Sequence, residues 1–226
     1  MSKIQKLVEK GTNLREKARH EQALEVLDEA LRLALRSRDF EGTAAALASR
    51  CLTWKHFYQL TGDKAYLYLA QSDASSGFAI VKAKKLKSLH SAFFRVAEIA
   101  VLAGDYEDAV SNYKWALRFY RGSHAEKGDY RYHYGQALYL AGRKQAGLRE
   151  LKGGLRDIQT YRGEVSTFLA NVWESGANMR LSELLWKSDG KEAEKHLTTA
   201  EKIIMGDKRL VMRRKQLAIL RKKLKA

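Results

Sequence analysis

Apolar side chains recur at helical spacing along nearly the whole chain. Over residues 24–35, leucines fall three and four positions apart with charged side chains between them, which places one apolar stripe on a helix. The same spacing returns over residues 96–103 and 109–120. Alternation of the kind that marks a strand is confined to residues 130–134, and that stretch continues at helical spacing. The pattern therefore predicts an all-α fold.

Glycine followed by aspartate divides this pattern into segments, at residues 62–63, 104–105 and 206–207. Glycine can end a helix in the left-handed conformation, and aspartate can cap the helix that follows. Together with further turn signals, these breaks predict one domain, residues 1–226, of about five antiparallel helix pairs and a basic capping helix at 207–226. The predicted pairs cover approximately residues 2–37, 40–85, 87–121, 125–159 and 162–205.

Three of these pairs share one spacing of small and large residues. Corresponding small positions are Gly11, Ala23 and Ala30 in the first pair, Ala97, Ala109 and Ala116 in the third, and Gly135, Gly147 and Gly154 in the fourth. Small residues allow two helices to cross closely. This spacing resembles the tetratricopeptide repeat, and residues 103–110 are the best match to its pattern. A helical bundle with small residues at its crossings is the alternative interpretation.

The second and fifth pairs are degenerate, because Lys55 and Leu181 stand where the repeat has a small residue. The small residue that opens each second helix falls at positions 23, 70, 109, 147 and 193, which gives steps of 47, 39, 38 and 46 residues. The basic repeat has about 34 residues. The resemblance is therefore to longer-helix members of the superfamily, such as kinesin light chains and some bacterial regulators.

This resemblance implies a right-handed superhelical solenoid whose concave groove, lined by the first helix of each pair, binds a peptide or helix of a partner protein. It implies no catalysis and no cofactor. The positions that would face the groove are Thr12, Arg15, His56, Gln59, Phe94, Glu98, Tyr132, Gln136, Tyr139, Asn178 and Ser182. Tyr132, Gln136 and Tyr139 share one helix face, which fits an extended peptide. A half-buried packing face explains the same three residues equally well.

Composition narrows the classes of function. The 226 residues include no proline and a single cysteine, which excludes Pro-rich linkers and an internal disulfide. We expect Cys51, among apolar neighbours, to be buried and inert. The six histidines show no short ligand spacing, and no catalytic motif is present, so we expect neither a metal site nor an enzyme. Without a secretory signal or a membrane span, we expect a cytoplasmic protein.

Basic residues exceed acidic residues by 16, with 42 Lys or Arg against 26 Asp or Glu. This excess favours an acidic partner. Much of it lies at residues 82–87 and 206–226, so the alternative function is binding to the phosphates of nucleic acid, although no nucleic-acid motif is present. The anion-binding candidates are Lys82, Lys84, Lys85, Lys87, Arg213, Arg214, Arg221 and Lys222. For the C-terminal segment, the simpler interpretation is a helix that covers the last repeat. The pattern leaves the oligomeric state and the partner's identity open.

Overall fold

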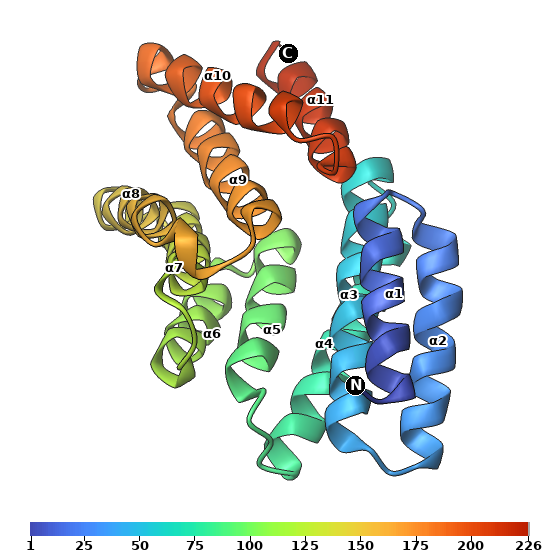
Figure 1. The fold of residues 1–226 in the computed structure, drawn as a ribbon. Coiled ribbons are helices and arrows are strands. Elements are labelled where there is room, and N and C mark those ends of the chain that lie inside the picture. Colours follow the sequence, from blue (N-terminus) through green and yellow to red (C-terminus); the bar gives the residue numbers. More distant parts are fainter. Residues whose placement is uncertain (226) are drawn as a thin grey trace. The chain divides into compact units, whose positions relative to one another are not determined.

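Helices account for nearly all of residues 1–225, the part of the chain that the computed structural model describes. Over these residues it contains eleven α-helices, one short 3₁₀ turn (Arg162–Glu164) and no strand, which confirms the all-α prediction (Figure 1). The helices are α1 (Lys3–Glu16), α2 (His20–Arg36), α3 (Phe40–Thr61), α4 (Lys64–Ala83), α5 (Leu89–Ala103), α6 (Tyr106–Phe119), α7 (His124–Leu140), α8 (Lys144–Thr160), α9 (Thr167–Leu185), α10 (Gly190–Gly206) and α11 (Val211–Lys225).

Successive helices pack as antiparallel pairs, from α1 with α2 to α9 with α10, and α11 packs on α9 and α10. The helices form two compact units, unit 1 with residues 1–119 and unit 2 from residue 120 onward. That all residues 1–226 belong to one domain stays a prediction. The fifth pair begins later than expected, because the 3₁₀ turn and the cap residue Ser166 precede α9.

The turns follow the predicted chemistry at most, though not all, positions. Gly62 and Gly104 adopt left-handed conformations with φ of 75° and 92°, and the Asp63 carboxylate accepts a hydrogen bond of 2.9 Å from the N–H of Ala65. The prediction for residues 206–207 is wrong. Gly206 is the last residue of α10, and Asp207 accepts hydrogen bonds from Arg209 instead of capping a helix.

The fourth pair shows why the repeat needs small residues. A Cβ atom on Gly135 would lie 2.5 Å from the backbone nitrogen of Leu151 and 2.7 Å from the carbonyl oxygen of Gly147. A Cβ atom on Gly154 would lie 2.5 Å from the carbonyl oxygen of Gly128. Since no side chain can approach backbone this closely, α7 and α8 can cross at this distance only with glycine.

Each unit has its own core. In unit 1, Cys51 of α3 packs with Leu67 and Ala74 of α4 and Ile99 of α5. Cys51 is fully buried, and burial raises the pKa of its thiol to about 12, so it is held as the unreactive thiol form, as expected. In unit 2, the apolar face of α11 packs on α9 and α10, in the manner of a capping helix. No helix within residues 1–225 combines the length and apolar character needed to cross a bilayer.

Candidate partner-binding surface

The first helices of the three pairs in unit 1 are consecutive neighbours, α1 beside α3 and α3 beside α5 (Figure 1). The predicted groove residues of this unit lie on these helices. Thr12, Arg15 and Glu98 make polar contacts between neighbouring helices, and these contacts form two small groups.

The first group joins α1 to α3. Arg15 Nη1 donates hydrogen bonds to Ser49 Oγ at 3.1 Å and to the Ser49 carbonyl oxygen at 3.4 Å. Thr12 Oγ1 lies 3.0 Å from the same Ser49 hydroxyl, and Glu16 pairs with the Arg15 guanidinium at 3.0 Å. Burial lowers the pKa of Arg15, but a guanidinium keeps its charge in a protein. A buried positive charge is therefore held in a fixed position between the two helices.

The second group joins α3 to α5. Lys55 Nζ lies 2.7 Å from Glu98 Oε1, and the guanidinium of Arg95 pairs with the other oxygen of the same carboxylate. Glu98 is only 7% exposed, so its charge depends on these two cations. Together the two groups hold three cations and two carboxylates on the α1–α3–α5 layer.

The remaining candidates in unit 1 are less available. Phe94 is buried, with its ring centroid 5.3 Å from that of Tyr113 in an edge-to-face contact. His56 is buried with its ring edge-on to His20 at 5.7 Å, and Gln59 is half-buried. Phe94 and His56 therefore contribute to packing, while Gln59 keeps part of its side chain accessible.

In unit 2 the predicted groove residues serve mainly in packing. Tyr132 is 2% exposed and belongs to a core cluster with Leu151 and Leu181. Tyr139 donates a hydrogen bond of 3.1 Å to the carbonyl oxygen of Leu184, which ties α7 to α9. Of the two interpretations of this helix face, the geometry of Tyr132 matches the packing face.

The other candidates of unit 2 are buried as well. Asn178 Nδ2 donates to the Glu174 carbonyl oxygen at 2.9 Å, and its Oδ1 lies 2.7 Å from His196 Nδ1. Gln136 and Ser182 are buried, and the Ser182 hydroxyl makes no hydrogen bond to residues 1–225. Among the predicted polar residues, Thr12 and Gln59 of unit 1 and Tyr139 of unit 2 are half-buried, and the others are buried.

Known proteins resemble this chain in fold rather than in sequence. No family model and no curated protein matches the sequence. Among solved structures, the kinesin light chain TPR-like repeats of Podosopora anserina are similar, with a TM-score of 0.57 and 14% identity over 91% of this chain and 97% of that one. A point variant of that protein gives a TM-score of 0.59 and 15% identity over 90% and 97%. The chain has a tetratricopeptide-like fold.

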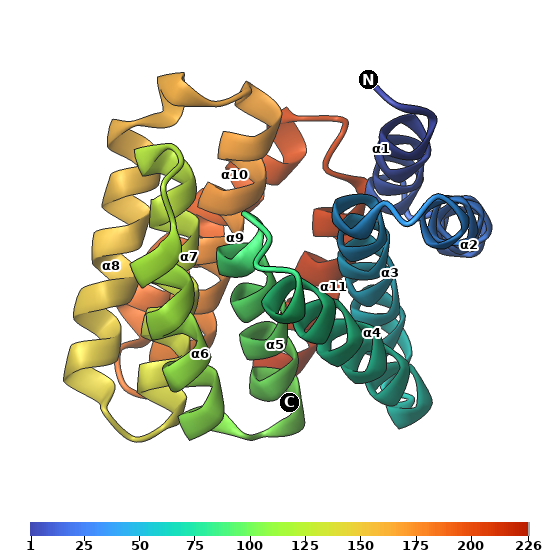
Figure 2. The ribbon, with the colours of Figure 1, turned by 90° about the horizontal axis from the view of Figure 1, so that it is seen from below.

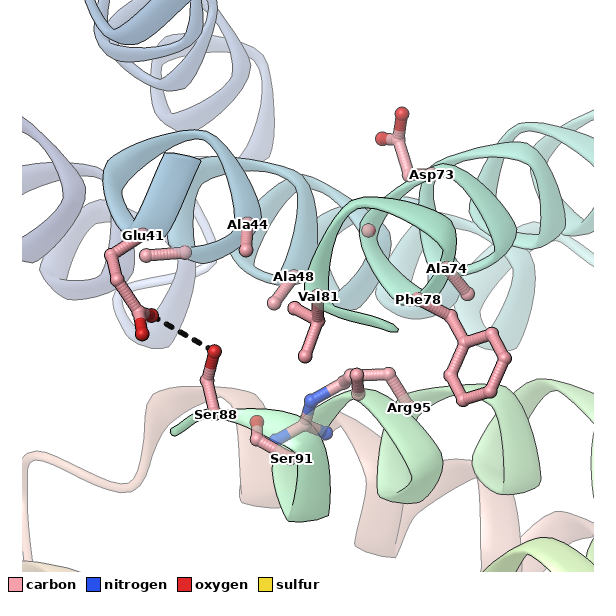
Figure 3. Close-up of a pocket in the computed structure, with 13 residues that line it drawn as sticks. Glu41, Ala44, Ala48, Asp73, Ala74, Phe78, Val81, Ser88, Ser91 and Arg95 are labelled. Carbon is pink, nitrogen blue, oxygen red and sulfur yellow. Dashed lines mark hydrogen bonds between the residues drawn. The ribbon is translucent and has the colours of Figure 1, made fainter. Parts of the chain in front are cut away.

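The TPR-like fold is typically protein-binding and generally non-catalytic. Among residues 1–225, no group of three or more His, Cys, Asp or Glu side chains could hold a metal ion. A cavity of about 140 Å³ lies between α3, α4 and α5 (Figure 3). Five of its thirteen lining residues are alanine and three more are Gly77, Phe78 and Val81. Of the polar lining residues, Asp73 points away from the cavity and Glu41 is hydrogen-bonded to Ser88, so few polar groups are left to orient a small ligand.

Sequence reasoning missed Ser49 and Arg95, and it recorded Lys55 only as a departure from the repeat. Ser49 and Lys55 both lie on α3, in the degenerate second pair. A charged residue at a position that the TPR-like repeat fills with a small one was the available signal for Lys55. Ser49 and Arg95 gave none, because their partners lie on other helices.

The anion-binding candidates fall into two groups. Lys82, Lys84, Lys85 and Lys87 are all exposed, at the end of α4 and in the turn that follows. On α11, Arg221 pairs with Glu201, and Arg214 donates to the carbonyl oxygens of Asp207 and Lys208. Arg213 donates to Gln216, and Lys222 is exposed. Much of the charge on α11 is thus engaged locally.

Proposed function

We propose that this protein is a non-catalytic interaction module that binds an acidic polypeptide segment along the α1–α3–α5 layer of unit 1. The observation that carries the proposal is the pair of interhelical polar groups, Arg15 with Thr12 and Ser49, and Glu98 with Lys55 and Arg95. The TPR-like fold, typically protein-binding, supports it.

Preorganisation is the physical reason to expect affinity there. Side chains that are already fixed by contacts within the protein lose little conformational entropy when a partner binds. Lys55 and Arg95 are half-buried and both pair with the single carboxylate of Glu98, so this group carries a net positive charge within reach of carboxylates of a partner. The buried charge of Arg15 adds no excess, because Glu16 pairs with it. The net charge of +16 would also speed the encounter with an acidic chain.

The tyrosines of α7 are unsuitable for testing this idea. Because Tyr132 lies in the core, Tyr132→Ala would remove buried area and destabilise unit 2 by about 3–5 kcal/mol. Loss of binding in that variant would report unfolding rather than a lost contact.

A suitable test selects peptides from a displayed random library on the full chain and measures their affinity for variants. We expect the selected peptides to be rich in Asp and Glu. Lys55→Gln should weaken them roughly tenfold, since hydrogen bonds between charged groups contribute about 1.5–3 kcal/mol. Lys64→Gln, which removes an exposed cation at the start of the neighbouring helix α4, is the matched control and should have little effect. Circular dichroism would verify that both variants are folded.

The proposal would be wrong if no peptide were enriched, or if enriched peptides bound Lys55→Gln and Arg15→Gln as tightly as the unmodified chain. Binding that survived replacement of every acidic residue in the peptide by its amide would also contradict it.

A further inference from the structure

One edge of unit 1 gathers basic and aromatic side chains from helices that are far apart in the sequence. This basic edge consists of the α2–α3 turn, the end of α4 with the α4–α5 turn, and the last turn of α6. Both turns lie at the lower side of unit 1 in Figure 1 and face the viewer in Figure 2. Contacts between side chains connect these segments into one strip.

The charge on the basic edge is strongly positive. Its seven cations are all exposed: Arg36, Arg38, Lys82, Lys84, Lys85, Lys87 and Arg118. The same segments and the start of α3 hold only two carboxylates, and both are engaged in the fold. Asp39 accepts a hydrogen bond of 2.8 Å from the N–H of Gly42, and Glu41 accepts from the Lys87 N–H at 3.2 Å and the Ser88 hydroxyl at 2.9 Å. The cations of the two turns and of the end of α4 therefore have few carboxylates near them to offset their charge.

Aromatic rings cross the same edge from α4 to α6. Phe93 of α5 is central, with its ring centroid 4.9 Å from Phe78, 6.2 Å from Trp115 and 5.9 Å from Phe119. The planes of Phe93, Trp115 and Phe119 are within 21° of parallel. Trp115 is 40% exposed and Phe119 38% exposed, so part of each side chain is accessible from solvent.

Cations and rings are paired along the strip. Lys84 Nζ lies 4.3 Å from the centroid of Phe40, which is 36% exposed, and Lys82 Nζ lies 5.9 Å from that of Phe78. The Arg118 guanidinium carbon lies 5.0 Å from the centroid of Trp115. Each pair thus places a positive charge beside an aromatic face.

The opposite edge of unit 1 does not share this charge. Its turns and the helix starts that follow them carry the cations Lys17, Arg19 and Lys64 and the carboxylates Asp63, Asp105, Glu107 and Asp108. The same helices run between both edges. The difference in charge between the edges therefore comes from the residues at the helix ends and turns, and not from the TPR-like repeat itself.

We propose that the basic edge binds single-stranded nucleic acid, with unpaired bases stacking on Trp115, Phe119 and Phe40 and phosphates held by the surrounding cations. Single-strand sites combine a positive surface with aromatic stacking platforms, because every base has a flat face and every linkage a negative charge. A duplex has no free base faces to stack.

This site is separate from the α1–α3–α5 layer and does not depend on the polypeptide partner proposed above. It also differs from a site on α11, whose arginines are partly engaged with Glu201 and with backbone carbonyl groups. Failure of one proposal therefore leaves the other untouched.

Two turn residues allow a test that cannot be confused with unfolding. Arg38 and Lys85 adopt left-handed conformations, with φ of 55° and 52°. In other turns, Gly62, Gly104 and Gly142 hold this conformation, and Ala18 holds it in the α1–α2 turn. Glycine adopts this conformation without strain. Arg38→Gly and Lys85→Gly should therefore leave Tm unchanged or raised while they remove two cations from the basic edge.

The experiment measures fluorescence anisotropy of labelled oligo-dT and oligo-rU of about 15 nucleotides with the full chain at about 50 mM salt. We expect Trp115→Ala to weaken binding roughly tenfold, which is within the range for one stacked base. The double variant Arg38→Gly/Lys85→Gly should also weaken binding. It should make the slope of log affinity against log salt shallower by about 1.4, as loss of two phosphate contacts predicts.

Matched controls come from the other end of α4 and from α11. Tyr68→Ala removes an aromatic ring that is more exposed than Trp115, and Lys64→Ala removes an exposed cation near it. Lys215→Ala and Lys222→Ala remove exposed cations from α11. All four should bind the oligonucleotides within about twofold of the unmodified chain.

Three results would overturn the proposal. The first is no binding of either oligonucleotide, and the second is equal binding by Trp115→Ala and the unmodified chain. The third is equal affinity for an oligonucleotide and its duplex, for polyglutamate of the same charge, or for phosphatidylserine vesicles. That result would show simple attraction to negative charge rather than a stacking site.

Discussion

The second and fourth helix pairs differ in the residues that lie where their two helices cross. In α7–α8, glycines from both helices oppose backbone, and added Cβ atoms would lie 2.5–2.7 Å from backbone nitrogen and oxygen. In α3–α4, alanines fill most of the small positions. A Cβ atom on Gly77 would meet only the Cβ of Leu47 at 3.7 Å, an ordinary van der Waals distance.

The charged side chains of the two pairs differ in a related way. In the fourth pair, Arg131 lies at the half-exposed rim and bridges Glu150 at 2.7 Å and Asp157 at 3.0 Å. In the second pair, Asp73 is buried 3.4 Å from Arg50, and neither Asp73 Oδ2 nor Arg50 Nε makes a hydrogen bond to residues 1–225. A close crossing leaves no room for charge between the helices, whereas a wider one admits a poorly satisfied ion pair and a cavity.

The largest effect should come from Gly154→Ala in the fourth pair. Its Cβ would lie 2.5 Å from the Gly128 carbonyl oxygen and from the Tyr132 nitrogen, and rigid backbone cannot yield without separating α7 from α8. We expect the free energy of unfolding of unit 2 to fall by about 4 kcal/mol. Denaturant unfolding followed by circular dichroism would measure this, with hydrogen exchange to locate the loss in α7 and α8.

The neighbouring glycine provides the control. A Cβ on Gly153 would lie 2.6 Å from the Arg131 guanidinium, the far end of a flexible side chain that can move. Gly153→Ala should therefore change stability by less than about 1 kcal/mol. Equal effects of the two substitutions would mean that the close crossing does not depend on glycine at residue 154.

A pH effect should distinguish the second pair. Burial raises the pKa of Asp73 to about 6, against the opposing influence of Arg50. In the unfolded chain an aspartate titrates near pH 3.9, so between about pH 4 and 6 the folded state holds more protons than the unfolded state. The stability contribution of Asp73 is therefore complete below pH 4 and is lost as pH rises through 6.

Asp73→Asn removes this titration. The unmodified chain should lose about 2–3 kcal/mol more stability than the variant between pH 4 and pH 7. Subtracting the two curves of unfolding free energy against pH cancels the other carboxylates. Parallel curves would show that the pKa of Asp73 is not raised in the folded state, and that burial of its charge does not destabilise the second pair.

The sequence predicted the parts of this molecule that depend on neighbours along the chain. The offsets of Gly135, Gly147 and Gly154 located the crossing of the fourth pair, because the repeat fixes which positions meet. The sequence could not show whether Tyr132 faces a groove or the core, because spacing at i, i+4 and i+7 places residues on one helix face in either case. Ser49 and Arg95 were missed for a different reason, because their roles arise from contacts with other helices.

The aromatic strip of the basic edge could not be predicted from patterns of neighbouring residues along the sequence either. Phe78, Phe93, Trp115 and Phe119 occupy ordinary helical positions, and only the packing of α4, α5 and α6 brings their rings together. The basic run at residues 82–87 was visible in the sequence, but its aromatic neighbours were not.

The smallest effect, and one of opposite sign, should come from Gly77→Ala in the second pair. Gly77 lies inside α4 and borders the alanine-lined cavity, where an added methyl group meets no atom closer than 3.7 Å. Alanine costs less backbone entropy than glycine in a helix, so we expect unit 1 to gain about 0.5–1 kcal/mol. The denaturant midpoint would rise without a change in m-value. Destabilisation would mean that α3 and α4 cross as closely as α7 and α8 do, and the contrast between the two pairs would then rest on their charges alone.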